Sequence, residues 1–140
     1  MNMSKIIFDS LIVGGGPAGL SAALALARVR RTALVFDSGH YRNQGVSAMH
    51  TVLSRDGTPP TEFRQTARSQ IEEKYPNIHF SDAQVQNASQ VDVGDGYMGY
   101  QLTDIDDNIY QSRKLILALG SEDVLPANIE GYKENWPSHM

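Results

Sequence analysis

A run of glycines between an apolar segment and a helical segment constrains the fold of this chain more than any other feature. Residues 8–37 read FDSLIVGGGPAGLSAALALARVRRTALVFD. Residues 11–13, with a lead-in from Ile6, are typical of a strand, and residues 32–36 are typical of a second one. A GxGxxG pattern lies between them and opens a helix near Pro17, where the missing N–H has no intrahelical partner to lose. This order of elements predicts an α/β fold.

Each glycine of the pattern has its own physical reason. Gly14 allows a sharp turn off the strand, Gly16 lacks the Cβ that would hold a pyrophosphate away from the backbone, and Gly19 lets the helix lie close to the sheet. The first helical turn, with Pro17 and Ala18, offers free N–H groups and about half a positive charge to a diphosphate.

Asp37 ends the second strand, eighteen residues beyond Gly19. A carboxylate at this place can accept hydrogen bonds from both hydroxyls of an adenosine ribose, and it would repel a 2′-phosphate. The pattern therefore predicts binding of an adenine dinucleotide, without separating FAD from NAD. A tight turn in an α/β domain that binds no ligand is the alternative that these residues leave open.

The composition narrows the class of partner. A chain of 140 residues is long enough for one domain with a real core, and a net charge of -4 argues against nucleic acid or an anionic membrane. The absence of cysteine excludes a disulfide, a zinc-thiolate site and a dithiol centre on this chain, and we expect no metal site. No apolar run reaches membrane-spanning length and the N-terminus does not resemble a secretory signal, so we expect a cytoplasmic protein.

Residues 38–60 are polar and read as a loop beside the bound ligand. We expect Arg42 to lie near the phosphates and either His40 or His50 to approach a bound ring. A loop histidine is more often a solvated or structural residue than a catalyst, so only their position in the chain favours these two.

The next segment predicts an amphipathic helix. Thr58 is expected to cap it with Pro59 at its first position, and the helix should stop before Pro76. Apolar side chains recur every four residues along one face and are expected to face the sheet: Phe63, Ala67, Ile71 and Tyr75. The intervening charged residues are expected to form a solvated face without a function: Glu62, Arg64, Arg68, Glu72 and Lys74.

The rest of the chain predicts an antiparallel meander and then one more strand. The expected strands are residues 78–80, 83–85, 91–93, 97–102 and 109–111, followed by the apolar run 114–119, which is typical of a strand buried on both faces. Residues 121–140 read as an extended exit segment. The predicted fold class is therefore a Rossmann-like α/β domain, a parallel sheet with an antiparallel β-meander, which favours a flavoprotein variant over the plain NAD domain.

Several ordered segments resemble the thioredoxin reductase family of FAD enzymes, and most closely its fungal branch of gliotoxin-oxidase-like proteins, which oxidise dithiols in secondary metabolites. The matching segments are LIVGGGPAGLSAALALAR, VFDSGHYRN, MHTVLSRDG and KLILALGSEDVLPANIEGYKENW. The resemblance implies an FAD-binding domain. It assigns the diphosphate to Gly14, Gly16 and Gly19, together with the first helical turn at Pro17 and Ala18.

The resemblance also assigns the other parts of the cofactor. Asp37 and the adjoining Ser38 would meet the adenosine ribose, and the backbone around Val85 would meet the adenine. The phosphate or ribityl side falls to Arg42 and Asn43. His50 would lie near the isoalloxazine as the catalytic residue, and Gly120 would close the site.

Two departures from the family pattern matter. The family's Ala-Thr-Gly signature reads Ala118-Leu119-Gly120 here, so one hydroxyl contact is lost. The Cys-x-x-Cys pair and the NADPH domain, which in the family lie beyond the position of Trp136, are not present, so we interpret residues 1–140 as a single, partial FAD-binding domain. Losing two or three hydrogen bonds from the family's returning segment would weaken FAD binding roughly thirty- to a few-hundred-fold. We expect a homodimer or a complementary chain to cover the exposed apolar surface.

Three functional hypotheses remain at this point. In the first, the domain binds FAD and oxidises or dehydrogenates a small secondary metabolite with dioxygen as acceptor, and His50 accepts a proton. In the second, a non-redox cyclase or isomerase uses acid–base residues of the old cofactor cleft: Asp37, His40, Tyr41 and His50. In the third, the chain is a split or inactive subunit that needs a partner chain.

Overall fold

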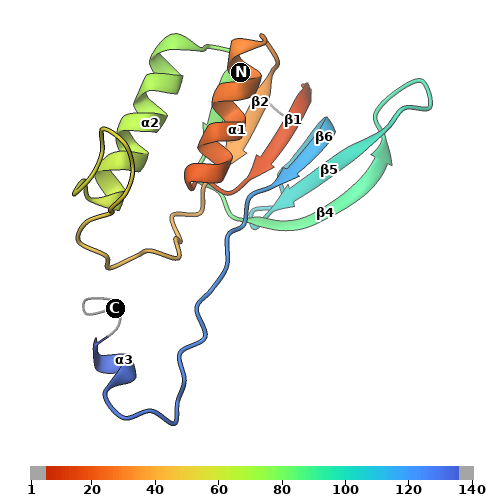
Figure 1. The fold of residues 1–140 in the computed structure, drawn as a ribbon. Helices are drawn as coiled ribbons and strands as arrows, with labels where there is room; N and C mark the ends of the chain where they lie inside the picture. Colours follow the sequence, from red (N-terminus) through yellow and green to blue (C-terminus); the bar gives the residue numbers. More distant parts are fainter. Residues whose placement is uncertain (1–5, 136–140) are drawn as a thin grey trace.

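A computed structural model describes residues 6–135 and shows one twisted six-stranded sheet with two helices on one face (Figure 1). The strands are β1 (Ile7–Val13), β2 (Ala33–Phe36), β3 (Ile78–Ser81), β4 (Val85–Asp92), β5 (Met98–Asp104) and β6 (Ile109–Leu117). The helices are α1 (Pro17–Arg28), α2 (Pro60–Lys74) and the short α3 (Tyr132–Asn135). The strand order is β3-β2-β1-β6-β5-β4.

One half of the sheet is parallel and carries the helices. β1 lies between β2 and β6 and is parallel to both, and β3 is parallel to β2. α1 and α2 lie side by side over this half. The core between helices and sheet is built from small and branched side chains, among them Ile12, Ala23, Val35 and Ile71.

The other half of the sheet is the antiparallel meander β4-β5-β6. A second apolar cluster joins the meander to the central strands, and Phe36 of β2 meets Tyr110 of β6 edge to face at 5.0 Å between ring centres. The fold class predicted from the sequence, a Rossmann-like domain with an antiparallel meander, is therefore confirmed.

A buried aspartate holds the turn between β5 and β6. Asp104 is 1% exposed and accepts hydrogen bonds from the backbone N–H groups of Asp106 and Asn108 at 3.0 and 2.9 Å and from the Tyr110 hydroxyl at 3.1 Å. Burial raises the pKa of Asp104, but the hydrogen bonds from the Asn108 side-chain amide, at 3.2 and 3.0 Å, and those named above outweigh it and hold the pKa below its ordinary value of 3.8. Because Ile105 also donates to the Gln84 carbonyl at 3.0 Å, this turn fixes the start of β4.

The strands of the meander are longer than the sequence predicts. β4 is one strand where two short segments were expected, because pairing with β5 continues through residues 86–90, which are exposed and mostly polar. β6 likewise continues through residues 112–113, which carry no apolar signal. The prediction that residues 114–119 form a strand buried on both faces is wrong, because the strand ends at Leu117, whose side chain is 63% exposed.

The start of α2 also differs from its prediction. Thr58 makes no capping hydrogen bond, and the helix begins at Pro60 with Pro59 as its N-cap. Pro59 has an extended backbone (φ -58°, ψ 137°), because a residue that precedes a proline is disfavoured in the helical region. Residues 118–131 run away from the sheet to α3, as expected for an exit segment (Figure 1). Residues 1–5 and the segment with Trp136 lie outside the described residues.

Candidate cofactor site

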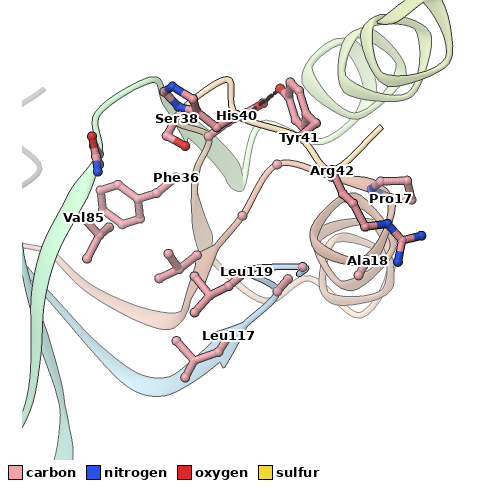
Figure 2. A pocket seen from close by; sticks show the side chains of 18 of the residues that line it. Pro17, Ala18, Phe36, Ser38, His40, Tyr41, Arg42, Val85, Leu117 and Leu119 are labelled. Atoms are coloured by element: carbon pink, nitrogen blue, oxygen red, sulfur yellow. Dashed lines mark hydrogen bonds between the residues drawn. The ribbon is translucent and has the colours of Figure 1, made fainter. Parts of the chain in front are cut away.

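A cleft of about 890 Å³ opens at the carboxyl ends of β1, β2 and β6, next to the N-terminus of α1 (Figure 2). In open parallel sheets this edge is where ligands bind. Ten of the residues predicted to bind the cofactor line this cleft: Gly14, Gly16, Pro17, Ala18, Asp37, Ser38, Arg42, Asn43, Val85 and Gly120. The fold thus brings together residues that are up to 106 positions apart, Gly14 and Gly120 (120 − 14).

Two glycines of the turn are required by the fold itself. Gly14 has φ +118°, and a Cβ on it would overlap the Ala118 carbonyl, which belongs to the segment after β6. A Cβ on Gly19 would overlap the Gly14 carbonyl, so its absence lets α1 lie directly on the turn. Gly19 does not line the cleft. Its close contact is with the backbone of the turn.

Gly16 is different, because nothing in the described chain occupies the place of its missing side chain. A Cβ built on Gly16 meets no atom within 4 Å, and its φ of -75° is one that any residue adopts. Gly16 is the N-cap of α1 and lines the cleft with Pro17 and Ala18. The bare backbone at a helix N-terminus is the feature that a diphosphate requires.

Gly15 is a residue that the sequence reasoning missed. A Cβ on Gly15 would overlap the carboxyl group of Asp37, so the acid lies directly against the glycine turn. The signal was present in the sequence, because three consecutive glycines exceed what the GxGxxG pattern requires.

The Asp37 carboxylate is held by the loop that follows β2. The Gly39 N–H donates to Oδ1 at 3.0 Å, and the Tyr41 hydroxyl, 2.8 and 2.6 Å from Oδ1 and Oδ2, donates to the same carboxylate. Burial, followed by these contacts with Asp37, raises the pKa of Tyr41 to about 12. Tyr41 therefore stays protonated and remains a donor through the neutral range.

Arg42 and a pair of apolar side chains complete the walls. The Arg42 guanidinium lies toward the N-terminal end of α1, and its Nη1 is 3.5 Å from the Ser121 hydroxyl (Figure 2). Phe36 and Val85 form an apolar side of the cleft. An open glycine backbone, a cation, a carboxylate and an apolar wall match the diphosphate, ribose and adenine of FAD, so the residues present fit this cofactor.

His50 is not brought to the cleft. It lies in the loop at residues 49–58, and its Nδ1 is 3.5 Å from Asp56 Oδ1, with side chains that are 70% and 71% exposed. His40 does line the cleft. Sequence position alone did not separate the two histidines, because the loop folds back between Met49 and Thr58 through a backbone hydrogen bond of 2.9 Å. Across residues 6–135 there is no group of side chains suited to a metal ion.

Residues 8–139 match the sequence profile of the family described as pyridine nucleotide-disulphide oxidoreductase. The chain belongs to this family. Members of the pyridine nucleotide-disulphide oxidoreductase family bind FAD, which agrees with the cleft described above. Within the described part of the chain, no helix has the length and apolar character needed to cross a membrane.

Fungal thioredoxin reductases are among the similar proteins. The chain is 46% identical over 137 residues to thioredoxin reductase tcpT of Claviceps purpurea, which covers 97% of this chain and 41% of that protein. It is 42% identical over 135 residues to thioredoxin reductase sirT of Leptosphaeria maculans, which covers 96% and 40%. The chain therefore spans about two fifths of the length of these relatives.

Solved structures of similar proteins have the same fold. An oxidoreductase from Agrobacterium tumefaciens is 39% identical with a TM-score of 0.83, over 95% of this chain and 43% of that one. A putative thioredoxin reductase TrxB from Bacillus anthracis is 28% identical with a TM-score of 0.79, over 86% and 38%.

Proposed function

We propose that this chain binds FAD in the cleft at the end of β1, β2 and β6, as the flavin-binding part of a thioredoxin reductase-like oxidoreductase. The observation that carries the proposal is the open backbone of Gly16 at the N-terminus of α1, on the same cleft as the Asp37 carboxylate. One group suits a diphosphate and the other suits a ribose diol.

The proposed contacts follow the lining of the cleft. The diphosphate would bind the N–H groups of the first α1 turn, with the Arg42 guanidinium as counter-charge. The ribose would bind Asp37, and the adenine would lie by Phe36 and the backbone at Val85. Asn43 and Gly120 would bound the other side of the cofactor. These roles rest on shared lining and on the chemistry of each group.

We further propose that the substrate is a small secondary metabolite. FAD, when bound, would supply a two-electron oxidation of this substrate, with dioxygen as the final acceptor. None of the 140 residues is a cysteine, so no dithiol of this chain takes part. The similarity to fungal thioredoxin reductases supports the redox class, and the substrate class rests on the resemblance to the branch that acts on secondary metabolites. The catalytic role of His50 stays a prediction.

The alternative non-redox reaction would need acid–base groups in the same cleft. Asp37, His40 and Tyr41 do line it. The Tyr41 hydroxyl, however, is engaged by Asp37, and its pKa of about 12 makes it a weak acid at neutral pH. Turnover of a metabolite by flavin-free protein would favour this second candidate over the redox one.

The test of the proposal is a titration of the purified, gel-filtered chain with FAD, followed by quenching of flavin fluorescence. We expect saturable binding of one FAD for each chain and a visible flavin spectrum. Gly16→Val serves as the matched control, because a Cβ at this cleft-lining position meets no protein atom within 4 Å. A wild-type chain that binds no FAD, or a variant that binds FAD equally well, contradicts the proposal.

A second polypeptide is also proposed, either another copy of this chain or a complementary chain. Apolar side chains outside the cleft are exposed along the exit segment, with Val124 and Ile129 at 94% and 52%. Light scattering after gel filtration tests for a copy of the chain: a homodimer has twice the 15.4 kDa of the chain. A monomeric mass at all concentrations, with no gain in FAD affinity on adding the remaining part of a relative, excludes both partners.

A further inference from the structure

The Arg64 side chain of helix α2 contacts two residues of the loop that lines the cofactor cleft, Tyr41 and Asn43. Its guanidinium stacks on the Tyr41 ring with 3.6 Å between Cζ and the ring centre. Nη1 donates to the Asn43 side-chain oxygen at 3.1 Å, and Nη2 donates to the Thr61 hydroxyl at 3.3 Å. The guanidinium thus ties the loop after β2 to the first turns of α2.

The contacts continue from Arg64 to the acid. The ring that Arg64 covers is the one whose hydroxyl donates to Asp37. A carboxylate has about four acceptor positions, and the Gly39 N–H and the Tyr41 hydroxyl take roughly half of them. The remaining positions are those available to a ligand in the cleft that Asp37 lines.

We propose that Tyr41 and Arg64 are positioning residues that hold the Asp37 carboxylate in the orientation that binds the ribose diol of the cofactor. This inference rests on the proposed binding of FAD. Tyr41 acts through its hydroxyl. Arg64 acts through its stacking on the ring and its hydrogen bond to Asn43, neither of which a lysine reproduces in the same planar geometry.

Three observations support a positioning role over simple packing. To accept hydrogen bonds from two ribose hydroxyls at once, both oxygens of the Asp37 carboxylate must lie in one fixed plane, and the Tyr41 hydroxyl contacts both oxygens. The high pKa of Tyr41 keeps its proton in place at neutral pH. A guanidinium stacked on an aromatic ring restricts the rotation of that ring.

The chain offers a matched control one helical turn further along α2. Arg68 also stacks on an aromatic ring, Phe80 at 4.7 Å, and pairs with Glu72 at 3.1 Å and Asp82 at 2.8 Å. Neither Arg68 nor these partners line the cleft. Arg68→Met therefore removes the same kind of interaction from the same helix without reaching Asp37.

The experiment compares ADP with 2′,3′-dideoxy-ADP, which lacks the ribose diol, by calorimetry on the full chain. In the wild type we expect ADP to bind at least tenfold more tightly than the dideoxy compound. In Tyr41→Phe and Arg64→Met we expect the affinity for ADP to fall about tenfold, while the affinity for the dideoxy compound changes less than twofold. The preference for ADP should therefore disappear. Arg68→Met should keep the wild-type preference.

The outcomes distinguish a failure of the proposed FAD binding from a failure of the positioning roles of Tyr41 and Arg64. A wild type that binds neither FAD nor ADP overturns the proposed function and this inference together. A wild type that prefers ADP, with variants that keep the preference, overturns this inference alone, as does tighter ADP binding by Tyr41→Phe, which would show that the hydroxyl competes with the ribose. Thermal unfolding is measured in parallel, and Tyr41→Phe keeps the ring under Arg64, so the test stands if Arg64→Met does not fold.

Discussion

Substituting the three glycines of the turn one at a time separates the needs of the fold from the needs of the ligand. Gly16→Val adds a branched side chain whose Cβ has no protein atom within 4 Å, at a φ of -75° that valine accepts. Valine is a poorer N-cap than glycine, which destabilises the folded chain. It also lowers the conformational entropy of the unfolded chain, which stabilises the fold by about 0.4–1 kcal/mol. We expect these effects to cancel, so that the free energy of unfolding changes by less than about 1 kcal/mol.

The effect of Gly16→Val on the cofactor should be much larger. The new side chain would occupy the place proposed for the diphosphate and would separate that group from the N–H groups of the first α1 turn. A hydrogen bond to a charged group contributes about 1.5–3 kcal/mol, so losing two costs at least about 3 kcal/mol, or more than roughly 100-fold in affinity. The assay is FAD titration, together with urea unfolding of the same preparation.

Gly14→Ala and Gly19→Ala should behave in the opposite way. The first forces alanine to φ +118° and into the Ala118 carbonyl, and the second drives a Cβ into the Gly14 carbonyl. Strain at such a φ costs Gly14→Ala about 1–3 kcal/mol. In both variants the new Cβ also overlaps a backbone carbonyl, so both should lose stability in urea. Unchanged FAD affinity in Gly16→Val, or unfolding of that variant together with stable Gly14→Ala, would refute the division of roles within the turn.

Three further perturbations follow from the same geometry. Asp37→Ala should weaken FAD binding by about 1.5–3 kcal/mol, or roughly ten- to 150-fold in affinity, and an unchanged dissociation constant would exclude a contact between Asp37 and the ribose. Arg42→Ala should lower the affinity for FAD roughly tenfold at low salt and less at high salt, whereas a salt-independent effect would exclude a charge contact with phosphate. Asp104→Ala should lower the urea stability by about 3 kcal/mol, because it leaves the donors of the β5–β6 turn without their buried acceptor. Since the folded pKa of Asp104 is depressed, its contribution is present at neutral pH and is lost as the pH falls below about 3.8; acid unfolding of wild type and variant should therefore converge, and parallel curves would contradict this.

The parts of the molecule that short stretches of sequence specify were predictable from the sequence. The turn at Gly14, the start of α1 at Pro17 and the acid at the end of β2 depend on backbone sterics and on periodicities within a few residues. The α/β class followed from the order of these elements. The full length of β4 was not predicted, because its polar residues lie at a sheet edge and are recognised as strand only through their pairing with β5.

The tertiary structure alone decided which side chains share the cleft. Nothing in the sequence near Arg64 links it to Asp37, because the link through Tyr41 exists only once α2 lies beside the loop after β2. The same reason separates His40 from His50: both lie in one polar loop, and the path of that loop depends on hydrogen bonds between its distant ends. Local chemistry determined the elements and the glycine turn, and long-range contacts determined which side chains surround the ligand.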